Sequence, residues 1–138
     1  MADVPSLIAA RRWIGTPYFV GQAARGLGCD CVGLIRGVWA DLTGNPPPPV
    51  PGWRPDWFNG PDRPLVEAAR TYLHPVPLAE VAPGDMVVLR IQGTREAHCG
   101  ILDHGDQIIH AVEGTGVVLV PFASFRAGVS FAARFPAP

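Results

Sequence analysis

The sequence contains no lysine, although 11 of its 138 residues are basic, and all 11 are arginine. This absence excludes a Schiff-base amine, a phosphate-binding P-loop lysine and a lysine general base. The chain also has little net charge, formally −1, which argues against a broad basic surface for nucleic acid. We therefore expect neither lysine-dependent catalysis nor nucleic-acid binding.

Long apolar runs are also absent. No window reaches the roughly 18 apolar residues that a membrane span requires. The start of the chain, Met1 to Ile14, has no basic segment ahead of its apolar stretch, because Arg11 and Arg12 follow that stretch. It therefore predicts no secretory signal, and we expect a chain made in the cytoplasm.

Cysteine is scarce and odd in number, with Cys29, Cys31 and Cys99. At least one thiol is therefore unpaired in a monomer, which argues against a disulfide framework. Each thiol is a buried small side chain, a metal ligand or a nucleophile, and the neighbouring residues distinguish these three roles. Cys29 and Cys99 are expected to be structural, since neither begins a predicted helix.

The length and the 48% hydrophobic content are typical of one globular domain, so residues 1–138 are predicted to form a single domain. Eight of the 16 prolines fall within residues 46–64, which predicts one long loop over residues 45–64. The loop carries Trp53 and Trp57. These two side chains either cover the edge of the core or anchor a partner.

Apolar periodicity predicts helices before and after this loop. The first covers residues 4–14, with Asp3 or Ser6 as its cap. The second begins after Asp30 as N-cap and ends before Gly44. Its apolar face consists of five residues at helical spacing: Cys31, Leu34, Ile35, Val38 and Leu42. A third helix is predicted over residues 65–73 and ends at His74-Pro75.

Beyond residue 85 the pattern changes to short β-type runs separated by turn residues. Five strands are predicted, over residues 86–90, 98–103, 107–112, 117–121 and 130–135. Helices followed by a series of antiparallel strands indicate an α+β fold, with N-terminal helices packed on a small antiparallel β-sheet.

One cysteine and two histidines suggest chemistry in this arrangement. Cys31 lies in the first turn of a predicted helix, where backbone N–H groups lower the pKa of a thiol. His98 and His110 lie on consecutive strands of a predicted hairpin, so the two side chains can share one face. We predict that Cys31 is a nucleophile, that His98 is its base, and that His110 orients His98. His104 falls in the turn and is expected to be solvated.

Zinc binding is the chemical alternative. The chain offers ligands of the types that zinc takes: Cys29, Cys31, His98, Cys99 and His110. Their spacing is poor, however, because neighbouring residues on a strand point in alternate directions.

The same residues resemble the NlpC family of bacterial cell-wall cysteine peptidases. The resemblance spans roughly residues 8–120 and follows the order of the family's motifs. Its front half comprises Gly15-Thr16-Pro17-Tyr18 and Gly28-Cys29-Asp30-Cys31-Val32-Gly33-Leu34. Its back half comprises Pro83-Gly84-Asp85, His98-Cys99-Gly100-Ile101 and Ile109-His110-Ala111.

The resemblance implies a papain-like α+β fold in which Cys31 is the nucleophile, His98 the base and His110 the third polar residue. It also implies that Tyr18 and Asp30 line the substrate site, and that backbone N–H groups near the nucleophile form an oxyanion hole. The implied substrate is a peptidoglycan stem peptide, with no cofactor and no metal. The residue after the nucleophile departs from the family, which usually has serine where this chain has valine.

As an NlpC-like domain of this size standing alone, the chain resembles the domains found in phage tails and gene-transfer agents. This resemblance implies delivery to the wall in a phage-like tail particle, with tail hub or tip proteins as partners. The alternative is a structural tail-tip or hub subunit that keeps the peptidase fold and has little or no activity.

Overall fold

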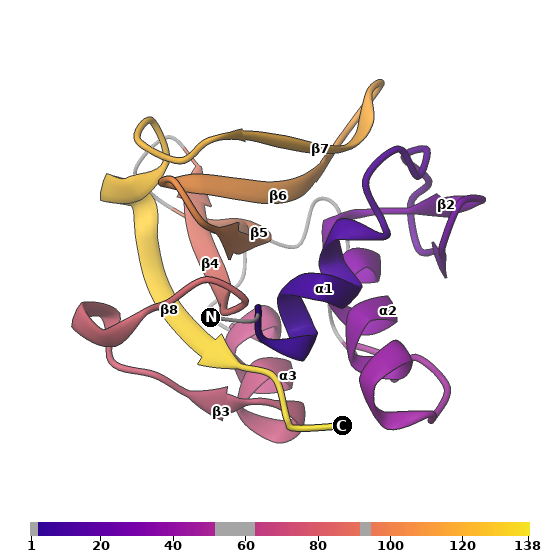
Figure 1. The fold of residues 1–138 in the computed structure, drawn as a ribbon, viewed down its shortest axis with the longest axis horizontal. Coiled ribbons are helices and arrows are strands. Elements are labelled where there is room, and N and C mark those ends of the chain that lie inside the picture. The colour runs from indigo at the N-terminus through magenta and orange to yellow at the C-terminus, as the bar shows by residue number, and fades with distance from the viewer. Residues whose placement is uncertain (1–2, 52–62, 92–94) are drawn as a thin grey trace.

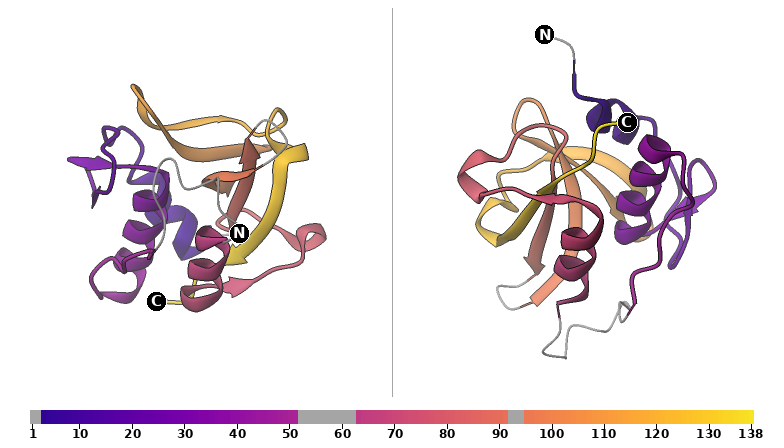
Figure 2. Two further views of the ribbon diagram at one scale, coloured as in Figure 1. Left: turned by 180° about the vertical axis from the view of Figure 1, so that it is seen from behind. Right: turned by 90° about the horizontal axis from the view of Figure 1, so that it is seen from below.

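The computed structural model describes residues 3–51, 63–91 and 95–138 of the chain. These residues form three helices and a six-stranded antiparallel sheet, and Figure 1 shows the helices gathered to one side of the strands. Figure 2 shows the same arrangement from two further directions. Trp53 and Trp57, the two tryptophans of the predicted proline-rich loop, lie outside the described residues. No helix of the described segments is long and apolar enough to cross a membrane.

Helix α1 spans Pro5–Arg11 and is shorter than the predicted 4–14. Its N-cap residue is Val4, which makes no side-chain cap, so the prediction of Asp3 or Ser6 as the cap is wrong. Both predicted caps have other partners. Asp3 pairs with the last arginine of the helix, and the Ser6 hydroxyl donates to the carbonyl oxygen of Gly84 at 2.9 Å.

Helix α2 spans Cys31–Thr43 and has the predicted caps. The Asp30 side chain accepts a hydrogen bond from the Gly33 N–H, and Gly44 ends the helix in the left-handed region at φ 74°. Gly37 lets Trp13 pack directly on this helix, because a Cβ at position 37 would lie 2.1 Å from the indole ring. The turn that follows α1 is therefore packed against α2.

Helix α3 spans Pro64–Tyr72, one residue earlier than predicted. The described part of the preceding loop, residues 45–51, contains neither helix nor strand, as predicted. The dipeptide after the helix does more than end it. It forms the short strand β3 (His74–Pro75), which pairs with the last strand of the sheet.

The sheet has the strand order β3-β8-β4-β5-β6-β7. Its longer strands are β4 (Met86–Ile91), β5 (Arg95–Asp103), β6 (Gln107–Val112), β7 (Gly116–Pro121) and β8 (Val129–Arg134). All five were predicted, β6 with the same bounds and the other four with shifts at their ends. Two 3₁₀ turns, η2 (Leu78–Glu80) and η3 (Arg126–Gly128), lie between strands. A small hairpin of β1 (Ala23–Ala24) and β2 (Gly28–Cys29) was not predicted.

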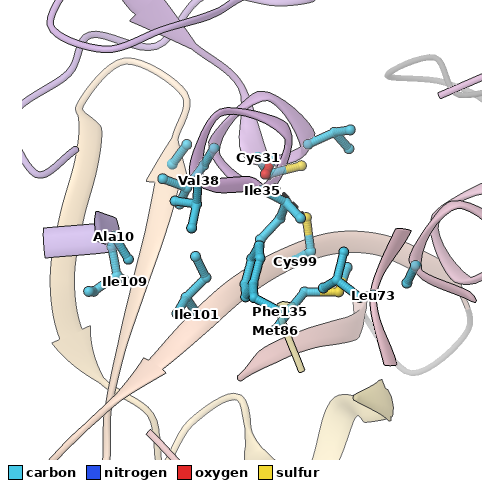
Figure 3. Close-up of a cluster of buried hydrophobic side chains, with 14 of the residues drawn as sticks. Ala10, Cys31, Ile35, Val38, Leu73, Met86, Cys99, Ile101, Ile109 and Phe135 are labelled. Carbon is cyan, nitrogen blue, oxygen red and sulfur yellow. Dashed lines mark hydrogen bonds between the residues drawn. The ribbon is translucent and has the colours of Figure 1, made fainter. Parts of the chain in front are cut away.

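Alternate residues of β5 and β6 belong to two apolar clusters. Ile101 and Ile109 pack with α1 and α2, whereas Leu102 and Ile108 pack in a second cluster with Phe122. This alternation is the period of two that a strand imposes on its side chains. Figure 3 shows the first cluster, where side chains of α2 meet those of the sheet.

Candidate active site

The first turn of α2 is held in place by Asp30, which is 1% exposed. One carboxylate oxygen accepts the Gly33 N–H at 2.6 Å, and the other accepts the Gly21 N–H at 2.6 Å. Asp30 therefore ties the preceding loop to the helix and makes Cys31 the first helical residue. Its predicted substrate contact stays a prediction, and both of its oxygens are engaged within the fold.

Gly33 allows the loop to cross this first turn closely. A Cβ at position 33 would lie 1.8 Å from the carbonyl oxygen of Gln22, which is far inside contact distance. Only glycine leaves room for the Gln22 backbone here. The Asp-Cys-Val-Gly run thus combines a cap, a thiol and a position at which the loop backbone passes directly over the helix.

The two predicted imidazoles lie in direct contact. His98 Nε2 and His110 Nδ1 are 2.8 Å apart, and the ring planes meet at 74°. The register that pairs Ile101 with Ile109 makes the two histidines diagonal neighbours on β5 and β6. The prediction that they share one face is confirmed. Because Nε2 of His98 is engaged with His110, Nδ1 is the ring nitrogen left to face Cys31.

Opposing effects set the ionisation of Cys31. Hydrogen bonding with the Cys99 thiol lowers the pKa of Cys31, burial opposes this, and a hydrogen bond with His98 and its charge lower the pKa further, to about 6 from an ordinary value of 9.0. The first-turn N–H groups of α2 favour the anion in the same direction. Cys31 is thus a thiolate at neutral pH, although its residue is only 4% exposed.

His110 is held neutral. Burial, followed by the charge of His98, lowers the pKa of His110 to about 4. Its ring also contacts Phe125 edge-on, with the ring centroids 5.3 Å apart. A neutral imidazole can accept a hydrogen bond at one nitrogen, which is the role an orienting group needs toward the base.

Tyr18 lies close enough to the thiol to be affected by its charge. Burial, then the charges of Cys31 and Asp30, raise the pKa of Tyr18 to about 12. Its hydroxyl is therefore protonated at neutral pH and can donate. The residue is half-buried, and its backbone bridges to Cys29.

Cys99 was expected to be structural, and it is a buried core residue that also contacts Cys31. Its thiol donates to the Cys31 carbonyl oxygen at 3.2 Å, and Cys99 is wholly buried (Figure 3). The sequence offers one signal for this contact, since Cys99 follows His98 on the same strand. That signal is weak, because adjacent strand residues usually face opposite ways.

The remaining candidates lie elsewhere or are inert. Burial, then the charges of Asp30 and Cys31, raise the pKa of Cys29 to about 12. His104 is exposed in the β5–β6 turn, as predicted, and its Nε2 lies 2.6 Å from Asp3. Within the described segments, no three His, Cys, Asp or Glu side chains are grouped so as to hold a metal ion.

Val32 stands where the resembling family usually has serine, and its surroundings are apolar. It is 5% exposed and lines a cavity between α2 and α3 together with Leu65, Met86 and Cys99. A hydroxyl at this position would face that cavity, where Arg36 is the one charged residue among the described lining residues. Position 32 thus belongs to the packing beside the thiol.

Comparisons with known proteins identify the family and the fold. Residues 15–125 match the sequence model of the NlpC/P60 family. The NlpC/p60 domain of the peptidoglycan hydrolase SagA matches with a TM-score of 0.65 and 26% identity, over 95% of this chain and 97% of that one. No match is found among curated protein sequences.

Two more distant structures share the fold. NlpC2 from Trichomonas vaginalis matches with a TM-score of 0.67 and 18% identity, over 98% of this chain and 48% of that one. An NlpC/P60 family protein from Bacillus cereus matches with a TM-score of 0.66 and 16% identity, over 99% of this chain and 41% of that one. The predicted papain-like α+β fold is confirmed by these likenesses.

Proposed function

Because the chain belongs to the NlpC/P60 family and places a thiol beside two imidazoles, we propose that it is a cysteine peptidase that hydrolyses peptide bonds in peptidoglycan stem peptides. The observation that carries the proposal is the 2.8 Å contact of His98 with His110, on the strands next to a Cys31 that begins a helix. This is the order of nucleophile, base and orienting group that acyl transfer by a thiol requires.

In the first half of the reaction, the Cys31 thiolate attacks the carbonyl carbon of the scissile bond. The carbonyl oxygen becomes an oxyanion, which needs N–H donors aimed at it. Since the Gly33 N–H is committed to Asp30, the first-turn donors left for this role among the described hydrogen bonds are those of Cys31 and Val32. His98 then gives the proton on Nδ1 to the leaving amine, and a thioester forms.

In the second half, water attacks the thioester. His98, now neutral, accepts the proton of the water through Nδ1, and the thiolate leaves as the carboxylic acid product forms. His110 accepts a hydrogen bond from His98 Nε2–H throughout, which fixes the ring with Nδ1 toward the sulfur. The Tyr18 hydroxyl is protonated and can donate, and we assign it to substrate binding. Asp30 acts on the site through the loop and the helix turn that its two oxygens hold.

The test is hydrolysis of purified peptidoglycan, with released stem-peptide fragments identified by mass spectrometry. We expect the wild-type protein to release fragments and Cys31→Ala to release none. Cys29→Ala is the matched control, because it removes a buried thiol two residues away. Equal activity of the wild type and Cys31→Ala would rule out thiol catalysis.

We further propose that the peptidase is made in the cytoplasm and acts from a phage-like tail particle, docked on hub or tip proteins. The support is the resemblance to tail-module domains. Proteomics of purified tail particles from producing cells is the test. Absence of the chain from such particles would contradict this proposal. Its presence in particles, without any wall hydrolysis, would favour a structural tail-tip role.

A further inference from the structure

Two of the three cysteines are in contact at the site. The Cys99 Sγ lies 3.2 Å from the carbonyl oxygen of Cys31, and both residues are buried, at 0% and 4% exposed. They come from different elements, since Cys31 begins α2 and Cys99 lies in the middle of β5, 68 residues further along the chain. Peptide hydrolysis as derived above uses only one of them.

We propose that Cys31 and Cys99 form a reversible disulfide when a small hydroperoxide oxidises the site, and that this bond switches the peptidase off. The inference rests on the proposed function in one respect, namely that Cys31 is its reactive thiol. The disulfide would join the first turn of α2 to β5 and remove the nucleophile.

The chemistry balances in two steps. The Cys31 thiolate attacks one oxygen of hydrogen peroxide, the O–O bond breaks, and a sulfenic acid forms on Cys31 while the released hydroxide takes a proton from His98 to become water. The Cys99 sulfur then attacks the sulfenic sulfur, so that an S–S bond forms, the S–O bond breaks, and the hydroxyl group leaves as water with the Cys99 proton. The two thiols are oxidised by two electrons in all, and the peroxide is reduced to two water molecules.

Oxidation of Cys31 does not need Cys99 to be ionised. Once Cys31 is oxidised, the Cys99 thiol loses its proton more readily. The hydrogen bond with Cys31, burial and the Cys31 charge keep the pKa of Cys99 well above its ordinary value while Cys31 is a thiolate. Conversion of Cys31 to a neutral sulfenic acid removes that charge. Cys99 therefore stays a thiol in the working enzyme and becomes able to react after oxidation.

Hydrogen peroxide is small enough to reach a sulfur whose residue is 4% exposed, and it needs no binding site of its own. Cys29 is the internal control for selectivity among the thiols. It is also buried and lies closer to Cys31 in sequence, but burial, then the charges of Asp30 and Cys31, raise the pKa of its thiol to about 12.

The test treats the folded protein with hydrogen peroxide, blocks free thiols, and maps cross-linked peptides by mass spectrometry without reduction. We expect a Cys31–Cys99 linkage, loss of two hydrogen atoms, loss of wall hydrolysis, and recovery of both thiols and activity with dithiothreitol. Cys29→Ala should behave as the wild type. In Cys99→Ser and Cys99→Val, Cys31 should pass on to sulfinic acid, which dithiothreitol does not reverse.

Two variants at position 99 guard against a folding defect in either one, and circular dichroism identifies the folded variant. A linkage of Cys29 to Cys31, or sulfinic acid at Cys31 in the wild type with Cys99 left free, would overturn the inference. Because the linkage is read by mass, it is separable from the peptidase assay. A linkage that forms in a protein without wall hydrolysis would refute the proposed function alone.

Discussion

At the scale of single residues, Cys31 and His110 depart from their ordinary ionisation in complementary ways. Burial alone would raise the pKa of a thiol, but hydrogen bonding with Cys99 and then His98 brings the pKa of Cys31 to about 6. Burial lowers the pKa of His110 to about 4. Above pH 6 the site therefore holds a thiolate and a neutral orienting imidazole together.

The first prediction concerns the pH dependence of Cys31 alkylation. Since the pKa of Cys31 is lowered to about 6, the thiolate fraction rises as pH increases through 6 rather than through 9. Iodoacetamide labelling of Cys31, followed by mass spectrometry from pH 4 to pH 10, should show a midpoint near 6. In His98→Gln the midpoint should move upward, because the imidazolium charge is lost.

Cys29 provides the internal control for this labelling. Burial, followed by the charges of Asp30 and Cys31, raises the pKa of the Cys29 thiol to about 12. It should remain unlabelled below pH 9. Preferential labelling of Cys29 over Cys31 at pH 7 would contradict the assigned ionisation.

The second prediction concerns His110 as a positioning residue. His110→Ala removes the partner of His98 Nε2 and should reduce kcat by about 100-fold or more, with little change in KM, because the base is no longer held in line. His110→Asn keeps an acceptor oxygen and should recover part of kcat. Steady-state kinetics on a stem-peptide substrate would measure both variants. An Ala variant as active as the Asn variant would remove His110 from the mechanism.

At the scale of elements, local signals predicted α2 well and α1 less well. Helix α2 has its cap, its apolar face and its terminal glycine within one stretch of sequence. Helix α1 lacks a side-chain cap, because the Ser6 hydroxyl bonds to Gly84, 78 residues away, and no local pattern contains that partner. The β1–β2 hairpin escaped prediction because strands of two residues have no periodicity.

The third prediction tests the crossing of the loop over α2. In Gly33→Ala, the new Cβ would meet the Gln22 carbonyl oxygen at 1.8 Å, so the loop must move off the helix. We expect a loss of about 3 kcal/mol in the free energy of unfolding. We also expect slower Cys31 alkylation at pH 7, because the Asp30 cap is displaced with the loop. Urea unfolding and thiol labelling measure the two effects.

Gly44→Ala is the matched control on the same helix. Gly44 has φ 74° but open space around its Cβ position, so the substitution should cost about 1 kcal/mol through backbone strain alone. It should leave Cys31 alkylation unchanged. Equal effects of the two substitutions on alkylation would show that the loop crossing does not position the thiol.

At the scale of the whole molecule, the sequence predicted candidate site residues that the structure brings together, but it did not predict the contacts that hold them in place. Spacing and motif order indicated Cys31, His98 and His110 together. The arginine–carboxylate pairs were not predicted, since they join residues far apart that follow no periodic pattern. Arg63 binds Glu96 through two hydrogen bonds of 2.7 and 2.6 Å, and so fixes the start of α3 to β5 two residues before His98.

A second arginine binds the same strand at its other end. Arg11 of α1 donates to both oxygens of Asp103 at the far end of β5, at 3.1 and 2.7 Å. Strand β5 is therefore held at both ends, with His98 between. Glu96 and Asp103 are 7% and 6% exposed, so loss of either arginine leaves a buried carboxylate without its main partner.

The fourth prediction follows from these pairs. Arg63→Gln should lower the free energy of unfolding by about 1–3 kcal/mol, since the buried Glu96 carboxylate loses a charged partner. Arg11→Gln should also lower it, through the loss of the pair with Asp103. Arg126→Gln is the control. Its pair with Asp106 is exposed on both sides, and its loss should cost less than about 1 kcal/mol. Urea unfolding at pH 7 compares the three variants.

The pH dependence separates this ionic effect from simple packing. The hydrogen bonds from Arg63, against burial, lower the pKa of Glu96, so the pair stabilises the fold above the ordinary pKa of a glutamate and this contribution is lost as pH falls through the lowered value. The difference in unfolding free energy between the wild type and Arg63→Gln should therefore shrink as pH is lowered from 7 toward 3. A difference that stays constant over this range would mean that Arg63 acts by packing its aliphatic stem, and that its charge does not anchor β5.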